Sequence, residues 1–165
     1  MRKSNVDDAS FDEPRDHDGF RARRARIGYA LGAERLGVSV WELPPGQAAY
    51  PYHYHHAEEE LLVVLEGTPS LRSPDGWSEL AGGDIVSFPR GEAGAHQLLN
   101  RTDGVVRFIA VSTNGETDVV IYPDSGKLCA AERLPHGGGL HTFFRLADQV
   151  SYWEGEQPPV HGQSQ

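Results

Sequence analysis

Short segments rich in β-forming residues alternate with turns that contain proline or glycine from residue 36 to residue 122. A new segment begins about every 8–12 residues, which is the spacing of an all-β sandwich or barrel. Leu36–Leu43 alternates in polarity and is followed at once by Pro44-Pro45-Gly46. No sustained helical periodicity interrupts this pattern. The chain is therefore predicted to be all-β.

The turns bound the predicted strands. Pro74-Asp75-Gly76 indicates a hairpin, because proline presets φ and glycine accepts a positive φ. After residue 122 the signals weaken, and residues 147–153 are expected to pack as a short turn on the barrel. The further strands are predicted at residues 48–55, 60–65, 68–73, 77–80, 85–88, 95–100, 105–112 and 119–122, with an edge strand at 141–146.

Composition excludes several classes of protein. A chain of 165 residues favours one domain. The net charge of −9 argues against a nucleic-acid partner. No apolar run approaches the ~20 residues that span a membrane, and the N-terminus lacks the apolar core of a secretory signal. One cysteine permits no intrachain disulfide. We expect a cytoplasmic protein with neither a nucleic-acid nor a membrane partner.

The two ends of the chain are predicted to differ from its centre. Residues 1–20 are polar and acidic, so a flexible arm is expected there. The basic run that follows could bind a phosphate or a nucleic acid, but pairing with the acidic arm or with a partner subunit is favoured. That run comprises Arg21, Arg23, Arg24 and Arg26. Residues 156–165 are expected to form a tail.

Three histidines and three glutamates lie within residues 53–60. His53 and His55 are two apart, so both imidazoles project from the same face of a strand. Glu60 begins a second predicted strand and is followed by an apolar run. Its carboxylate could lie on the same side as the two imidazoles. Two neutral nitrogens and an anionic oxygen make a divalent metal site. His96 lies in another predicted strand and would add a third imidazole if that strand pairs near the first.

These residues resemble the two sequence motifs of the cupin superfamily. The first motif, which contains His-x-His and a glutamate between two glycines, is matched by Gly46, His53, His55, Glu60 and Gly67. The second motif is matched by Gly83, Pro89, Gly91, His96 and Asn100. The match covers residues 36–112, and the longer context is similar to small uncharacterised bacterial cupins. Two loops depart from the motifs, because six residues separate Gly46 from His53 and four separate Gly91 from His96.

The resemblance implies a double-stranded β-helix, or jelly-roll barrel. It places a single cupin domain at residues 21–155 with the motif-bearing core at residues 36–122. It also implies a six-fold site for one divalent ion, Zn, Mn, Fe, Ni or Co, and the donor set does not choose among them. We predict a homodimer as well, because small cupins often pair through sheet edges and N-terminal arms. The implied metal ligands are His53, His55, Glu60 and His96.

The function implied by the resemblance is metal-dependent chemistry on a small polar metabolite, such as a sugar, a sugar phosphate or a carboxylate. The metal would act as a Lewis acid or as an O₂-activating centre, so an isomerase and a dioxygenase are both open. The alternative is a non-enzymatic module that binds a small ligand or senses a metal, because a fold does not fix a function. No catalytic residue is assigned from the sequence.

Other polar and aromatic residues near the motifs are given structural roles. Glu58 is expected to be solvated in a turn, and Glu59 to point away from Glu60. Alternation predicts that Tyr50 and Tyr52 face away from the histidine pair. A second metal site at His136 and His141 is a minor alternative. Core, surface or structural roles are preferred to ligand contact for Trp41, Phe88, Arg90, Gln97 and Arg107, and an inert thiol for Cys129.

Overall fold

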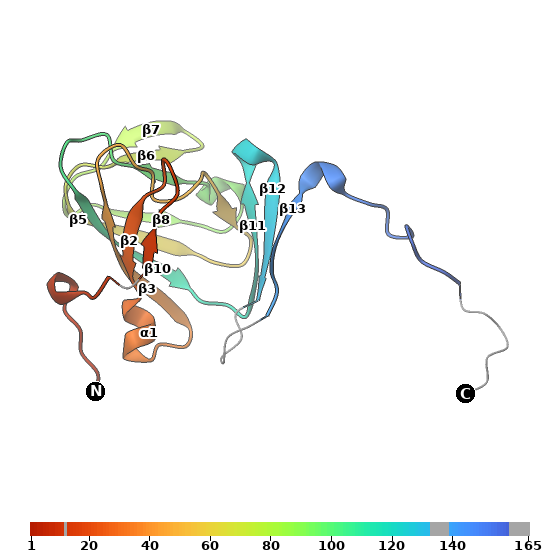
Figure 1. Cartoon of the computed structure of the whole chain (residues 1–165), viewed down its shortest axis with the longest axis horizontal. Coiled ribbons are helices and arrows are strands. Elements are labelled where there is room, and N and C mark those ends of the chain that lie inside the picture. The colour runs from red at the N-terminus through yellow and green to blue at the C-terminus, as the bar shows by residue number, and fades with distance from the viewer. Residues whose placement is uncertain (12, 133–138, 159–165) are drawn as a thin grey trace.

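The computed structural model describes residues 1–11, 13–132 and 139–158 (Figure 1). His136 and residues 159–165 of the predicted tail lie outside this part of the chain. The helical elements are η1 (Val6–Asp8), α1 (Ile27–Leu31), η2 (Glu92–Gly94), η3 (Pro123–Ser125) and η4 (Leu146–Asp148). The strands are β1 (Glu13–Arg15), β2 (Ala22–Ala25), β3 (Leu36–Leu43), β4 (Tyr54–His55), β5 (Glu60–Glu66), β6 (Ser70–Ser73), β7 (Gly76–Glu79), β8 (Ile85–Phe88), β9 (Gln97–Leu99), β10 (Val106–Thr113), β11 (Thr117–Tyr122), β12 (Lys127–Glu132) and β13 (His141–Arg145).

The described strands form three antiparallel sheets. A six-stranded sheet has the order β1-β2-β3-β10-β5-β8, a four-stranded sheet the order β13-β12-β11-β4, and a three-stranded sheet the order β7-β6-β9. Strands that are neighbours in a sheet are often distant in sequence, as with β3 and β10 or β4 and β11. This arrangement confirms the predicted all-β class and is that of a jelly-roll barrel.

The core lies between the six-stranded sheet and the sheet of β6 and β9. On β10, Val106 and Phe108 point inward and are fully buried, and on β5 Leu62 and Val64 do the same. Alternation along each strand therefore turns one apolar face toward the opposite sheet. The cluster comprises Ala22, Trp41, Leu43, Ala49, Leu62, Val64, Leu71, Leu80, Phe88, Leu98, Val106 and Phe108.

Most predicted strands are present, two of them with the predicted bounds, at Leu36–Leu43 and Ile85–Phe88. The predicted strand at residues 48–55 is interrupted. Only isolated bridges at Ala48 and His53 and the short β4 remain of it. Pro51 lies at this interruption and lacks the backbone N–H that a continuous ladder needs.

The N-terminal region contributes to the sheet. The predicted flexible arm includes β1, which pairs with β2 at the edge of the six-stranded sheet. The favoured pairing of the basic run with the acidic arm is found at Arg21, whose guanidinium lies 2.9 Å from Asp16 and 3.4 Å from Asp18. Arg107, for which a structural role was preferred, donates to the Val6 carbonyl and so fastens η1 to β10.

The C-terminal region differs from the prediction in two ways. β12 was not predicted, and it forms because all six of its residues pair with β11. Residues 147–153 do not pack on the barrel: the chain after η4 runs away from the body (Figure 1), and the side chains of Tyr152 and Trp153 are 82% and 74% exposed. None of the helices in the described residues is long and apolar enough to cross a membrane.

Candidate metal centre

A cavity of about 330 Å³ opens on the inner face of the six-stranded sheet and reaches β11 and β12. Its volume falls within the ~300–1,000 Å³ of small-molecule sites. The four residues with implied ligand roles, His53, His55, Glu60 and His96, all line it. The structure therefore brings together side chains that span more than forty positions of the sequence.

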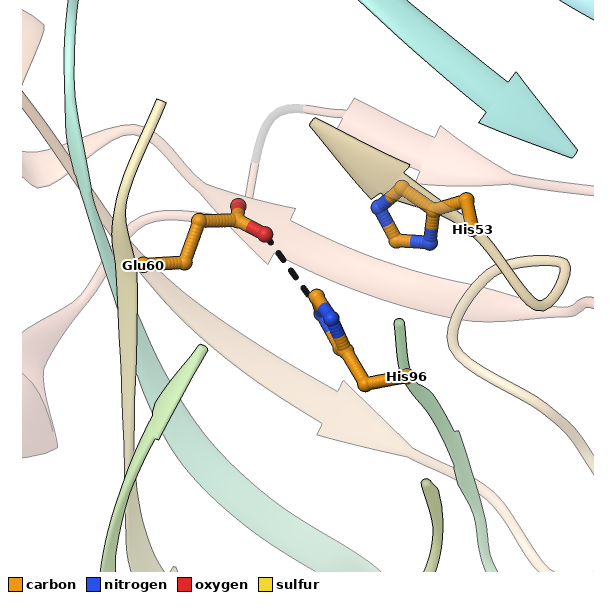
Figure 2. Close-up of side chains that lie close together, drawn as sticks. All are labelled: His53, Glu60 and His96. Atoms are coloured by element: carbon orange, nitrogen blue, oxygen red, sulfur yellow. Dashed lines mark ion pairs between the residues drawn. The ribbon is translucent and has the colours of Figure 1, made fainter. Parts of the chain in front are cut away.

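Strand pairing explains how these four side chains meet. His53 forms a bridge with His96, so the two imidazoles lie on adjacent backbone segments. His55 lies on β4, and its ring centroid is 5.0 Å from that of His53, as expected for residues two apart. Glu60 opens β5, where Ser112 and Phe88 flank it on the neighbouring strands. Figure 2 shows Glu60, His53 and His96 pointing toward one another from separate segments.

The distances between donor atoms suit one shared ion. One potential ligand atom from each of His53, Glu60 and His96 lies within 4.8 Å of the other two. Oε2 of Glu60 is 3.4 Å from Nε2 of His96 and 3.5 Å from Nε2 of His55. Donors that are each about 2.0–2.1 Å from one ion lie roughly 3–4 Å apart. The separations of Glu60 from His96 and from His55 are therefore those of ligands to one ion.

Backbone carbonyls set the tautomers of two of the histidines. Nδ1 of His53 is 2.9 Å from the Pro51 carbonyl oxygen, and Nδ1 of His96 is 2.9 Å from the Gly94 carbonyl oxygen. A carbonyl only accepts, so each Nδ1 carries the proton and donates it. The lone pair of each Nε2 then remains for the cavity, as in metal-binding histidines.

Asp118 sets the tautomer of the third histidine. Its Oδ2 lies 2.5 Å from Nδ1 of His55, and its Oδ1 accepts from the backbone N–H of Ala57. Burial opposes ionisation of the carboxyl, but the hydrogen bonds from His55 and Ala57 outweigh it and lower the pKa of Asp118. The carboxylate therefore holds the His55 ring and increases the basicity of its Nε2.

Two buried polar atoms at the centre have no hydrogen-bond partner among the described residues, namely Nε2 of His55 and Oε2 of Glu60. A buried acceptor without a partner costs about 1–3 kcal/mol. A cation bound between these atoms would remove that cost. A nitrogen and oxygen donor set without thiolate suits a divalent transition metal. The residues present therefore fit a metal ion.

Burial keeps the site in its metal-binding protonation state. It lowers the pKa of His96 to about 4 and that of His53 well below its usual value, because a charged imidazole is disfavoured in a poorly solvated place. Both rings are neutral at pH 7. Burial also raises the pKa of Glu60. A bound cation would oppose that shift and favour the carboxylate.

Aromatic rings form the walls around the histidines. Phe88 stacks on His96 with a centroid distance of 3.7 Å, and Tyr122 stacks on His53 at 5.9 Å. Tyr50 meets the edges of His53 and His96 at 4.9 and 5.3 Å. The prediction that Tyr50 faces away from the histidines is therefore wrong, because the interruption at Pro51 breaks the alternation that it assumed.

Glu58 also differs from the prediction. It was expected to be solvated, but the residue is 2% exposed, and its Oε2 lies 3.8 Å from Nδ1 of His55. The turn between β4 and β5 carries Glu58 inward beside Asp118, and His55, Glu58 and Asp118 form a second group of potential ligands. Glu59 is exposed. Asp118 was not identified from the sequence. The signal that could have found it is its place on the same face of β11 as the apolar Val120, since a charged residue on a buried strand face needs a partner.

The remaining predicted residues have the structural roles that were preferred for them. Trp41 and Phe88 belong to the core cluster. Gln97 donates to the Tyr50 carbonyl, and Arg90 is exposed. Cys129 is buried, and burial raises the pKa of its thiol, as expected of an unreactive cysteine.

Residues 39–112 match the family described as the cupin domain. The matched range holds the four clustered side chains and the strands that carry them. These residues form a cupin domain. Among proteins with curated descriptions, none matches this cupin significantly.

Several solved structures resemble this one over most of the chain. A sugar phosphate isomerase of the cupin superfamily from Silicibacter pomeroyi is 26% identical, with 92% of this chain and 98% of that one covered and a TM-score of 0.77. A protein from Acidithiobacillus ferrooxidans, provisionally named a sugar phosphate isomerase, is 28% identical over 81% of each chain, with a TM-score of 0.73. A polyketide cyclase from Streptomyces resistomycificus is 27% identical over 68% of this chain and 79% of that one, with a TM-score of 0.56.

Proposed function

We propose that this cupin is a metal-dependent isomerase of a small sugar phosphate. One divalent ion would be held by His53, His55, Glu60 and His96. The observation that carries the proposal is the pair of buried, unpartnered atoms at the centre, Nε2 of His55 and Oε2 of Glu60. The names of two of the matched structures support the substrate class.

The bound ion would polarise a carbonyl or hydroxyl group of the substrate as a Lewis acid. The protein's own residues prepare the cavity for this. His53 and His96 present neutral Nε2 atoms, because their Nδ1 protons are held by backbone carbonyls. Tyr122 has a pKa raised to about 12 by burial, so its hydroxyl keeps its proton at neutral pH. The walls of Phe88 and Tyr50 limit the water around the histidines.

Metal content tests the site. The double variant His53→Ala/His55→Ala is expected to be purified with less than a tenth of the wild-type metal, because two of four ligands are lost. The matched control is His56→Ala/Glu59→Gln, since both residues lie in the same segment and are exposed. Elemental analysis of protein purified without added metal gives the readout. Wild-type metal content in the first variant would contradict the ligand assignment.

Turnover separates isomerisation from the alternatives. The metal-loaded protein should interconvert an aldose phosphate and its ketose phosphate, which proton NMR follows, and the His53→Ala/His55→Ala variant should not. Oxygen uptake with the iron-loaded protein would instead favour a dioxygenase. Saturable binding of sugar phosphate without any turnover would favour the non-enzymatic binding module.

A further inference from the structure

Two arginines from the N-terminal region point into the same cavity. Arg15 lies on β1 and Arg24 on β2, and both line the cavity that contains the histidines. In the sheet, Arg24 is paired with Trp41 of β3. Trp41 belongs to the core cluster, so Arg24 lies on the inner face. Alternation turns its neighbour Arg23 to the other face, where it forms an ion pair with Glu42.

Both guanidinium groups are held against one indole. The guanidinium carbon of Arg15 is 5.1 Å from the centroid of the Trp41 ring, and that of Arg24 is 5.2 Å from it. Arg15 also donates from Nη1 to the Ala49 carbonyl oxygen over 2.9 Å. The contacts with a buried ring and a fixed carbonyl limit the freedom of two long side chains. The positions of the two positive charges are therefore restricted before any ligand binds.

A continuous set of contacts joins these arginines to the metal centre. The Trp41 ring is 6.3 Å from that of Tyr50, and Tyr50 in turn contacts His53 and His96. Burial and the charge of Glu60 raise the pKa of the Tyr50 phenol, and the positive charge of Arg15 partly offsets this rise. The cavity is thus lined by the two arginines beside Trp41 and by the histidines beside Tyr50.

Guanidinium groups suit an anionic oxygen group better than any other side chain does. Each carries five N–H donors in a plane and stays charged at every physiological pH. A guanidinium can bind two oxygens of a phosphate through two parallel N–H donors. A chain with a net charge of −9 would otherwise repel a phosphate monoester.

We propose that Arg15 and Arg24 form a phosphate subsite that holds the phosphate group of the substrate while its other end lies at the metal centre. The inference rests on the proposed function for the identity of the substrate. It adds two specificity-determining residues that lie outside both cupin motifs. It also gives the N-terminal strand β1 a role in recognition.

The test measures the binding of inorganic phosphate to the metal-free protein by isothermal titration calorimetry, so that phosphate cannot bind a metal. We expect saturable binding that Arg15→Gln and Arg24→Gln each weaken at least tenfold. Arg23→Gln is the matched control, because it removes a charge from the same strand on the opposite face, and its affinity should equal that of the wild type. Equal affinities for all three variants and the wild type would overturn the proposal.

A second measurement does not depend on the folding of the arginine variants. In a Trp77→Phe/Trp153→Phe background, Trp41 is the remaining tryptophan, and phosphate bound at the arginines should change its fluorescence saturably. No change up to tens of millimolar phosphate would overturn the subsite. Metal content, measured on the same samples, tests the proposed function separately. Normal metal content without phosphate binding refutes only the subsite, and phosphate binding without metal refutes only the metal centre.

Discussion

At the scale of single residues, each candidate histidine ligand depends on one neighbour that fixes its tautomer. Two of these neighbours are backbone carbonyls and one is the carboxylate of Asp118. A side-chain substitution cannot remove a backbone carbonyl, whereas it can remove the carboxylate of Asp118. His55 is therefore the histidine whose orientation a point mutation can test directly.

Replacing Asp118 is expected to weaken metal binding without removing a ligand. Asp118→Ala should lower the affinity for metal about 10–100-fold, the range typical of residues that orient a metal ligand. Asp118→Asn should lower it less, because the amide oxygen can still accept from Nδ1 of His55. Competition with a chelator measures both affinities. Asp124→Asn removes an exposed carboxylate paired with Arg72 and is the control. An unchanged affinity in Asp118→Ala would refute the orienting role.

The buried histidines should make the metal-free protein sensitive to acid. The pKa of His96 is about 4 in the folded protein and about 6.5 when unfolded. Between these values the unfolded chain binds more protons, so the free energy of unfolding falls as the pH falls from 6.5 to 4. The raised pKa of Glu60 acts in the opposite sense.

His96→Gln isolates the contribution of His96 to this pH dependence. Urea denaturation of the metal-free variant should show a smaller loss of stability between pH 7 and pH 4.5 than the wild type shows. The same loss in both proteins would mean that His96 is not buried in its neutral form.

At the scale of elements, the short helix η2 places the second half of the site. Its last residue, Gly94, supplies the carbonyl that holds Nδ1 of His96. A Cβ added to Gly94 would overlap with the Pro89 carbonyl oxygen, which is backbone and cannot move alone. The loop between β8 and β9 is longer than the cupin motif requires, yet this close approach keeps it compact.

Gly94→Ala is therefore expected to displace η2 and His96 together. Metal affinity should fall at least tenfold, and the free energy of unfolding should fall by about 1–3 kcal/mol, as for other overpacked positions. The control is Gly104→Ala, where an added Cβ has nothing within 4 Å. Chelator competition and thermal unfolding measure the two effects. Normal metal affinity in Gly94→Ala would show that His96 is positioned independently of η2.

At the scale of the whole molecule, apolar side chains are exposed along β13 and the segment that follows it. Phe143 and Phe144 are each about half exposed on the edge strand of the four-stranded sheet. Val150, Tyr152 and Trp153 are 66–82% exposed on the chain that extends from the barrel. Exposed apolar side chains at a sheet edge are typical of an interface. The homodimer stays a prediction, and we expect a second copy to cover these side chains.

Sedimentation equilibrium tests the homodimer, with an expected mass of twice 18.1 kDa. The triple variant Val150→Ser/Tyr152→Ser/Trp153→Ser should shift the protein toward the monomer, because the apolar area available to a partner is reduced. Tyr29→Ser removes an exposed aromatic from α1 and should leave the mass unchanged. A monomer mass for the wild type at micromolar concentration would refute the prediction.

Local signals in the sequence determined the strands and the histidine pair. Leu36–Leu43 and Ile85–Phe88 could be predicted because alternation and Pro/Gly turns act within a few residues. The common face of His53 and His55 follows from the two-residue period of a strand. The selection of Glu60 and His96 came from motif spacing, and the structure brings both to the same cavity.

Only the tertiary structure decided what surrounds those residues. Asp118 reaches His55 across 63 positions because β11 pairs with β4. Arg15 and Arg24 reach the cavity because β1 and β2 extend the sheet beside β3. Tyr50 turns inward because a single proline ends the regular alternation. Which strands pair, and in which register, depends on long-range packing of the whole barrel, and local periodicity carries no record of that choice.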